Sequence, residues 1–102
     1  MGQKVYVNLN KCKSFNQTLP GSSALTPLQS QVCSEVIMVN RSGGDIILFD
    51  NGNDAAENGF LLGNDESVTM RGITNSDQLS ATSASGGIVY YRAQYYSNNP
   101  SR

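Results

Sequence analysis

The residues able to perform acid–base or metal chemistry are few, and histidine is not among them. Histidine is the commonest general base near neutral pH and a frequent metal ligand. Its absence removes the Ser-His and Cys-His nucleophile pairs and most zinc and iron sites. The two cysteines, Cys12 and Cys33, are too few to complete a structural zinc site. The sequence therefore predicts a protein that is not an enzyme and that has no cofactor.

Carboxylates in predicted loops are the remaining candidates for metal chemistry, because their oxygens suit Ca²⁺. They are Asp50, Asp54, Glu57, Asp65 and Glu66. The stretch Asp50-Asn51-Gly52-Asn53-Asp54 superficially resembles a calcium loop, but it lacks the spacing and the flanking helices of an EF-hand. Turns use Asp, Asn and Gly for backbone reasons. We interpret the stretch as a turn and predict no metal site.

The segment 88–96 combines the alternation of a β-strand with residues that favour interfaces. Alternation places Val89, Tyr91, Ala93 and Tyr95 on one face, and Ile88, Tyr90, Arg92, Gln94 and Tyr96 on the other. Tyrosine buries apolar area and keeps a hydroxyl for a partner, and arginine pairs or stacks with it. We predict that the first face is buried and that Tyr90, Arg92 and Tyr96 contact another protein. The alternative is that the second face is merely exposed.

Residues 11–31 have no strand periodicity. Pro20, Gly21 and Pro27 oppose regular structure there. Four large apolar residues are spaced as separate anchors: Phe15, Leu19, Leu25 and Leu28. We therefore predict an extended arm that becomes ordered by lying across a neighbouring subunit. The alternative is that the segment packs on its own domain as an added short strand.

The elements that must position these residues are short strands. Alternation predicts a half-buried strand at 4–10. The segment 32–40 is β-rich, and its adjacent apolar residues at 36–39 predict a strand covered on both faces. Gly43 and Gly44 predict a hairpin turn that leads to a strand at 46–49. Further strands are expected at 60–62, 67–71, 78–82 and 88–96, and a single helical turn is expected near 54–57.

This pattern predicts an all-β fold: an antiparallel β-sandwich, jelly-roll-like or a small barrel, of about six to eight short strands with an N-terminal arm or long loop. The chain of 102 residues is expected to form a single domain, 1–102. Only 38% of its residues are hydrophobic, so the core is lean and burial against a partner would add to it.

Charge and hydropathy restrict the partners and the location. The net charge of −1 predicts no nucleic-acid partner. No membrane contact is expected, because no stretch has the length and apolar character of a spanning helix. No signal peptide is visible at the start of the sequence, so we expect synthesis in the cytoplasm, where cysteines stay reduced.

One run of elements has the pattern of a known class of proteins. A short apolar strand between Gly59 and Gly63 precedes Gly63-Asn64-Asp65-Glu66-Ser67-Val68-Thr69-Met70-Arg71-Gly72, then 75–80, then Gly87-Ile88-Val89-Tyr90-Tyr91-Arg92-Ala93-Gln94-Tyr95-Tyr96. From residue 32 onward the chain resembles small virion proteins of tailed bacteriophages. The resemblance implies a β-sandwich that decorates or cements a capsid, or that builds a tail or fibre, often as a trimer. It implies no particular functional residue.

The expected function is therefore that of a non-enzymatic structural protein of a phage virion, with capsid decoration or cementing ahead of a tail or fibre role. Its expected partners are other virion proteins, foremost the major capsid protein, and further copies of itself. A carbohydrate-binding receptor module is the alternative, in which tyrosines stack on sugar rings. A hydrolase with paired carboxylates is the least favoured class, because no two acids are anchored on strong strand positions.

Overall fold

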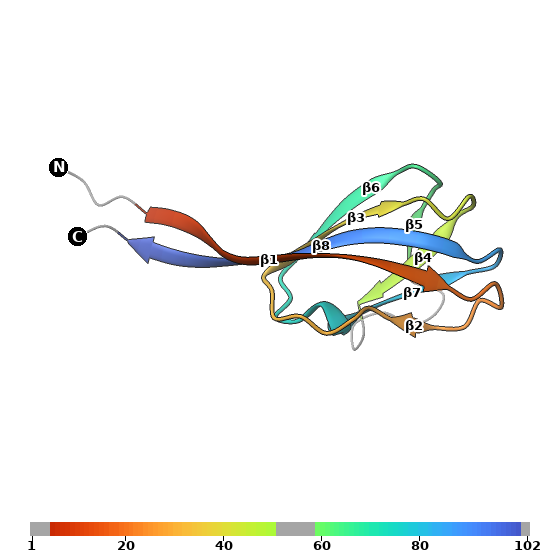
Figure 1. Ribbon diagram of the computed structural model, residues 1–102, viewed down its shortest axis with the longest axis horizontal. Helices are drawn as coiled ribbons and strands as arrows, with labels where there is room; N and C mark the ends of the chain where they lie inside the picture. The colour runs from red at the N-terminus through yellow and green to blue at the C-terminus, as the bar shows by residue number, and fades with distance from the viewer. Residues whose placement is uncertain (1–4, 51–58, 101–102) are drawn as a thin grey trace.

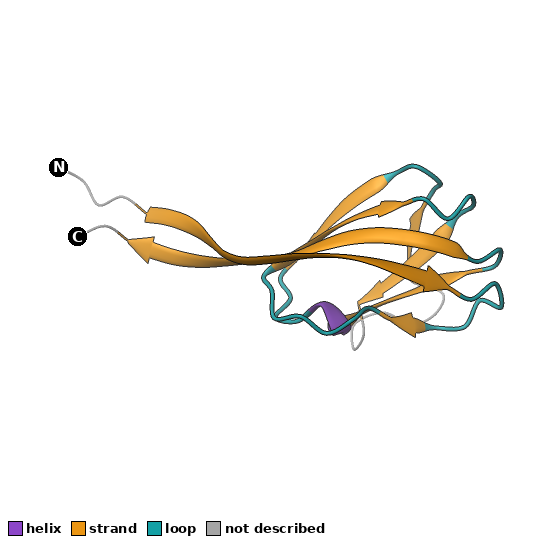
Figure 2. Ribbon diagram, in the orientation of Figure 1, coloured by secondary structure: helices purple, strands orange, loops and turns teal. Residues whose placement is uncertain are grey.

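The computed structural model describes residues 5–50 and 59–100, and the side chains of residues 12–50 and 59–95. Apart from one 3₁₀ turn, η2 (Ser76–Gln78), its elements are strands: β1 (Val5–Leu19), β2 (Thr26–Pro27), β3 (Glu35–Asn40), β4 (Ile46–Asp50), β5 (Phe60–Leu62), β6 (Ser67–Arg71), β7 (Leu79–Ser83) and β8 (Gly87–Pro100). Figure 2 shows this all-β architecture, which confirms the predicted fold class. The helical turn expected near 54–57 lies outside the described residues. Within them, no helix is long and apolar enough to cross a membrane.

The strands form two four-stranded antiparallel sheets, in the orders β1-β8-β3-β6 and β2-β7-β4-β5. Figure 1 shows them stacked as a sandwich. β1 pairs with β8, β2 with β7, β3 with β6 and β4 with β5. The chain is thus one long antiparallel hairpin wrapped on itself, and this strand order is that of a jelly roll. The sheets do not close into a barrel.

The core lies between the sheets and is built by strand alternation. Apolar side chains at every second position are 0–3% exposed, and they include Val36, Met38, Ile46, Leu48, Leu79, Ala81, Val89, Tyr91 and Ala93. The predicted buried face of 88–96 is therefore confirmed for Val89, Tyr91 and Ala93, whereas Tyr95 on the same face is only half-buried. The prediction that 36–39 is covered on both faces is wrong, because the side chain of Ile37 is 38% exposed. The other sheet covers only one face of β3.

The connection at Gly43 and Gly44 joins two sheets, so the predicted hairpin is wrong. β3 pairs with β6 and β8, whereas β4 pairs with β5 and β7. Gly43 has φ +91°, a backbone conformation that favours glycine. The buried side chain of Asn40 holds the turn: its Nδ2 donates to the carbonyls of Gly44 (2.7 Å) and Leu62 (3.0 Å), and its Oδ1 accepts from the amide of Ser42 (2.9 Å).

Residues 11–31 pack on their own domain, which corrects the prediction of an arm across a neighbouring subunit. β1 continues through this segment to Leu19, and β2 pairs with β7. Leu19 and Leu28, which we predicted as anchors for a partner, are 1% and 2% exposed within the core. The physical reason is that β8 supplies hydrogen-bond partners to β1 as far as the Leu19–Gly87 pair. The alternative, an added short strand, is the arrangement that forms.

A two-stranded ribbon projects from the sandwich. β1 and β8 pair from Val5–Pro100 to Leu19–Gly87, but β3 pairs with β8 only from Val89 to Gln94. Beyond this point, residues 5–11 and 95–100 form the ribbon, with a register shift between Leu9 and Lys11. The molecule accordingly measures 55 × 24 × 21 Å, and Figure 1 shows the start of β1 beside the end of β8 at the tip of the ribbon.

Candidate protein-binding surface

Strand register defines the face of the β1-β8-β3-β6 sheet that points away from the core. Because opposite residues in register share a face, this sheet carries parallel rows of side chains. One row is Ser14, Arg92, Ile37 and Thr69, and the next is Asn16, Tyr90, Val39 and Ser67. A third row is Cys12, Gln94, Glu35 and Arg71. We call the surface formed by these three rows the outer face.

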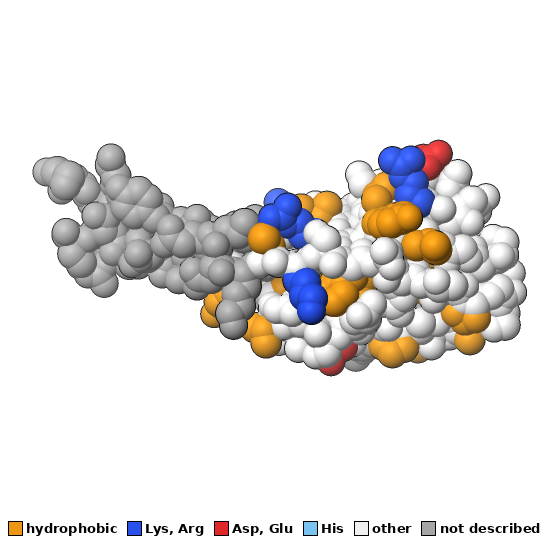
Figure 3. All heavy atoms as spheres, viewed as in Figure 1, with side chains coloured by type: hydrophobic (Ala, Val, Ile, Leu, Met, Phe, Trp, Pro, Cys, Tyr) orange, Lys and Arg blue, Asp and Glu red, His pale blue; other side chains and the backbone are white. Residues whose placement is uncertain are grey.

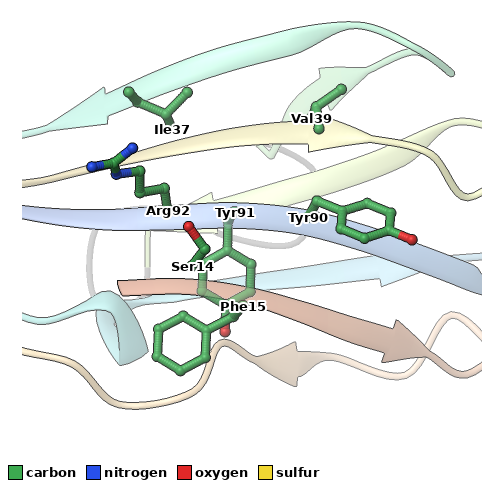
Figure 4. Close-up of a pocket in the computed structure, with 7 residues that line it drawn as sticks. All are labelled: Ser14, Phe15, Ile37, Val39, Tyr90, Tyr91 and Arg92. Atoms are coloured by element: carbon green, nitrogen blue, oxygen red, sulfur yellow. The ribbon is translucent and has the colours of Figure 1, made fainter. Parts of the chain in front are cut away.

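The centre of the outer face is apolar and open. The side chains of Ile37 and Tyr90 are 38% and 45% exposed. They border a hollow of about 370 Å³, drawn in Figure 4, whose lining is Ser14, Phe15, Ile37, Val39, Tyr90, Tyr91 and Arg92. Figure 3 shows hydrophobic side chains mixed with basic ones on the visible face, with acidic ones only at its margins. An exposed apolar surface of this kind is typical of a binding site.

The third row borders the hollow with paired polar groups. Glu35 accepts hydrogen bonds from the Arg71 Nε (3.3 Å) and the Gln94 Nε2 (2.6 Å). Arg92 Nη2 donates to the Cys12 Sγ (2.7 Å). The Arg71–Glu35 ion pair is solvent-exposed on the arginine side, so its contribution to stability is small, about 0–1 kcal/mol. The bond to Cys12 holds the Arg92 guanidinium at the edge of the hollow.

Tyr91 is the structural tyrosine of β8. Its ring stacks on Phe15 with centroids 5.1 Å apart. Its hydroxyl donates to the Gln17 Oε1 (3.0 Å) and accepts from the amide of Gln29 (2.8 Å), which fastens residues 26–31 to the sheet. Burial raises the pKa of the Tyr91 phenol, and the hydrogen bond from Gln29 opposes this rise. Tyr91 therefore serves packing, whereas Tyr90 is available to a partner.

The two cysteines occupy different environments, and both are free thiols. Cys33 is buried in the core, where burial, and secondarily the charge of Asp77, raises the pKa of its thiol. Cys12 is exposed on the outer face. They form no disulfide with each other.

The predicted interface residues separate into three groups. Tyr90 and Arg92 lie together at the hollow, whereas the ring of Phe15 stacks on Tyr91 on the inner side of the sheet. Leu19 and Leu28 are in the core, and Leu25 is exposed but does not line the hollow. The side chain of Tyr96 lies outside the described residues. The structure thus gathers two of the seven residues, Tyr90 and Arg92, on the outer face.

Ile37 and Val39 were missed by the sequence reasoning, although they line the hollow. Their apolar neighbours at 36 and 38 indicated a strand buried on both faces. A signal was present, since Glu35 and Arg41 share the parity of Ile37 and Val39. Charged residues at both ends of one face of a strand favour exposure of that face.

Of the carboxylates considered for Ca²⁺, Asp65 and Glu66 lie in the β5–β6 connection, whereas Asp50, expected in a loop, is the last residue of β4 and pairs with Leu79 of β7. Asp65, at φ +66°, pairs with Arg41 at 3.3 Å, and the Glu66 Oε1 accepts from the amide of Gly63 at 2.6 Å. Asp54 and Glu57 lie outside the described residues. Among the residues that are described, no three His, Cys, Asp or Glu side chains are grouped so that they could hold a metal ion.

The site therefore consists of an open apolar hollow on a sheet, with Tyr90 and Arg92 at its border. A scan against protein-family models, a search of curated proteins and a search of solved structures found no match to this chain.

Proposed function

We propose that this chain is a non-enzymatic structural protein of a phage virion that binds a neighbouring capsid subunit through its outer face. The observation that carries the binding role is the uncovered hollow bordered by Ile37, Tyr90 and Arg92. The virion role is supported by the sequence resemblance from residue 32 onward. Capsid decoration or cementing is favoured, and a tail or fibre position is the alternative within a virion.

The chemistry of the outer face suits a protein partner. Tyrosine and arginine are enriched among the residues that dominate binding energy. Complete burial of Ile37 or Tyr90 by a partner is worth about 1.5–3 kcal/mol each, relative to full exposure. The surrounding Ser14, Asn16 and Thr69 are neutral, so they can form hydrogen bonds at the rim without the desolvation cost of a charge.

The fold alone does not select one function, because jelly rolls include capsid proteins and lectins. The same hollow leads to the alternative of a carbohydrate-binding receptor module, since the exposed ring of Tyr90 offers a stacking surface for a sugar. Binding of a glycan and binding of a protein at this surface are distinguishable by experiment.

The virion role is tested by separating the heads and tails of particles from the virus that encodes the chain and locating the chain by immunoblot. We expect it in the head fraction. Its presence only with tails would support the tail alternative, and its absence from both would refute the virion role.

The binding surface is tested with two matched substitutions, Ile37→Lys and Leu61→Lys. Both replace an exposed apolar strand residue, but Leu61 lies on the other sheet. We expect Ile37→Lys to reduce binding of purified protein to heads that lack it, by about tenfold or more, and Leu61→Lys to leave binding unchanged. Equal losses would remove the outer face as the interface. Saturable binding on a glycan array that Tyr90→Ala abolishes would favour the carbohydrate alternative.

A further inference from the structure

The ribbon is joined to the rest of the sheet through a β-bulge in β1. Lys11 is opposite Tyr95 in register. Leu9, two positions earlier on β1, is opposite Tyr96, which is only one position later on β8. Asn10 is therefore the extra residue of a bulge, in which two residues of one strand oppose one residue of the other. The period of two on β1 is shifted by one position at Asn10, whereas β8 continues without a shift.

The bulge reverses the face on which the apolar residues of β1 lie. After the bulge, the odd-numbered Phe15 stacks on Tyr91 on the inner side of the sheet. Before the bulge, the odd-numbered Leu9 is opposite Tyr96, which shares strand parity with Arg92 of the outer face. Opposite residues share a face. Register therefore places the apolar residues at alternate positions of the ribbon on the outer face: Val5, Val7 and Leu9.

The outer face of the sandwich thus continues along one face of the ribbon. At the sandwich end of this surface, Ile37 and Tyr90 border the hollow. Tyr90 and Pro100, the last residue of β8, are ten strand positions apart, which corresponds to about 33 Å at about 3.3 Å per residue. Within the described residues, the ribbon projects beyond the second sheet and no strand covers its faces (Figure 1). We call the outer face together with this face of the ribbon the extended outer face.

Arg92 identifies the chemistry that this surface requires of a partner. It lies between the hollow and the ribbon, and its neighbours in register, Ser14 and Ile37, are uncharged. Its guanidinium donates to the Cys12 Sγ, which is a weak acceptor. A partner that covers the guanidinium must supply an opposite charge, because a buried charge is costly unless it is paired. The matching surface is therefore apolar, with a carboxylate opposite Arg92.

The extended outer face of a second copy does not offer this carboxylate. Residues 5–11 and 95–100 contain no acidic residue. The three rows of the outer face contain one, Glu35, which already accepts hydrogen bonds from Arg71 and Gln94. Two extended outer faces packed together would therefore bury the guanidinium of each copy without a carboxylate. The chemistry favours a different protein as the partner.

We propose that the neighbouring protein bound by the outer face also covers the ribbon, through an apolar strip with a carboxylate opposite Arg92. This inference rests on the proposed function and extends the contact from the hollow to the end of β8. The bulge at Asn10 sets the contact, because it places the apolar residues of the ribbon on the face that the partner covers. A two-stranded ribbon is marginally stable alone in water, so the ribbon is stabilised by the same contact.

The first test compares Val7→Lys with Tyr6→Lys in the purified full chain, added to heads that lack it. The two substitutions change the net charge equally and lie at neighbouring positions, but register places Val7 on the outer face and Tyr6 on the other. We expect Val7→Lys to weaken binding at least about tenfold and Tyr6→Lys to change it less than about twofold. Equal effects would contradict the proposal. If thermal unfolding shows that Val7→Lys is unfolded, Val5→Lys on the same face replaces it.

Failure of this inference is distinguishable from failure of the proposed function. Unchanged binding by Val7→Lys, together with loss of binding by Ile37→Lys, would remove the ribbon contact and leave the outer face as the binding surface. Absence of wild-type binding to the heads would refute the proposed function and this inference together. A dimer of the chain alone in sedimentation velocity, weakened by Val7→Lys, would assign the ribbon to a second copy and overturn the choice of partner.

The second test removes the bulge by deleting Asn10. The deletion leaves the net charge and the apolar residues unchanged, and it returns Val5, Val7 and Leu9 to the parity of the inner side. Pairing from Lys11 onward is retained, so we expect an unchanged thermal midpoint and a loss of binding of about tenfold. Asn10→Ser keeps the chain length and is the control, with binding expected within about twofold of the wild type. Unchanged binding by the deletion variant would show that the face of the ribbon is irrelevant and would sink the proposal.

The third test removes the charge of Arg92. Arg92→Gln and Arg41→Gln lower the net charge equally, but Arg41 follows the far end of β3 and pairs with Asp65. Binding to the heads is measured at about 50 mM and about 500 mM NaCl, between which the Debye length falls roughly threefold. We expect Arg92→Gln to weaken binding about tenfold at low salt and to reduce its salt dependence, and Arg41→Gln to behave as the wild type. Equal effects of the two variants, or unchanged binding by Arg92→Gln, would overturn the assignment of a carboxylate to the partner.

Discussion

The two faces of β8 have similar residues and different surroundings. On the inner face, Val89, Tyr91 and Ala93 are buried against the β2-β7-β4-β5 sheet. On the outer face, Ile88 and Tyr90 remain more than one-third exposed, and Arg92 is exposed as well. Each face carries a β-branched residue and a tyrosine, so composition does not distinguish them.

The difference is caused by the second sheet. An inner side chain loses its packing and its hydrogen bonds together when it is truncated, whereas an outer side chain loses only contacts along the sheet surface. The inner face therefore carries the stability of the domain. The outer face is left free to change its contacts when a partner binds.

The largest expected effect is that of Tyr91→Ala on the inner face. The substitution removes the stack on Phe15 and both hydrogen bonds of the hydroxyl. We expect the free energy of unfolding to fall by about 3–5 kcal/mol, a large part of the stability of a domain of this size. Urea unfolding followed by circular dichroism measures the change. Cooperative unfolding with an unchanged midpoint would show that the inner face is not the one that is buried.

A buried polar residue is expected to have the next largest effect. Asn40→Ala leaves the carbonyl of Leu62 and the amide of Ser42 without their side-chain partner, and the carbonyl of Gly44 keeps only the bond from the Ser42 Oγ. A buried polar group without a partner costs about 1–3 kcal/mol, so we expect a loss of about 2–4 kcal/mol. The exposed Asn64 bonds the neighbouring Gly43 amide and is the control, with an expected loss below about 1 kcal/mol. Equal losses in thermal unfolding would contradict the role of Asn40 in the turn between the sheets.

The raised pKa of the Tyr91 phenol predicts how the stability of the fold changes at alkaline pH. Burial raises the pKa of Tyr91 above its ordinary value of 10.0, so the folded state retains this proton at a pH where the unfolded state releases it. The associated stability is complete below about pH 10 and is lost as pH rises through the folded-state pKa. We expect Tyr91→Phe to lower stability by about 1 kcal/mol at neutral pH and to reduce the alkaline decline. Tyr90→Phe is the control, and an equally reduced decline in this variant would contradict the assignment.

Alternation or bounding glycines could predict strands from the sequence. β6 and β8 alternate, so their inner residues follow from the period of two, whereas β5 is a short apolar run marked by Gly59 and Gly63. The sheet to which each strand belongs could not be predicted in the same way. Gly43 and Gly44 allow a hairpin or a crossing between sheets, and only the distant pairing of β3 with β8 decides between them.

The extension of β1 through residues 11–19 was missed because it is an edge strand with many polar residues. Phe15 and Leu19 are the large apolar residues on the inner side of this segment, and polar Gln17 lies between them. The apolar–polar alternation that predicts a strand is therefore interrupted. The candidate site was predicted in part: Tyr90 and Arg92 were identified, whereas Ile37 required knowledge of which face of β3 the second sheet covers.

The smallest expected effect is that of Tyr90→Ala on the outer face. Tyr90 lies opposite Val39 and Asn16 in register, and such cross-strand pairs contribute about 0.2–1 kcal/mol. Its ring is already 45% exposed, so truncation creates no cavity. We therefore expect the free energy of unfolding to change by no more than about 1 kcal/mol. Urea unfolding measures this change, under the conditions in which Tyr91→Ala is expected to unfold at a lower urea concentration. A loss as large as that of Tyr91→Ala would mean that the outer face is covered in solution by this chain or by a second copy. Repeating the measurement at several protein concentrations distinguishes these cases, because only coverage by a second copy makes the unfolding midpoint depend on concentration.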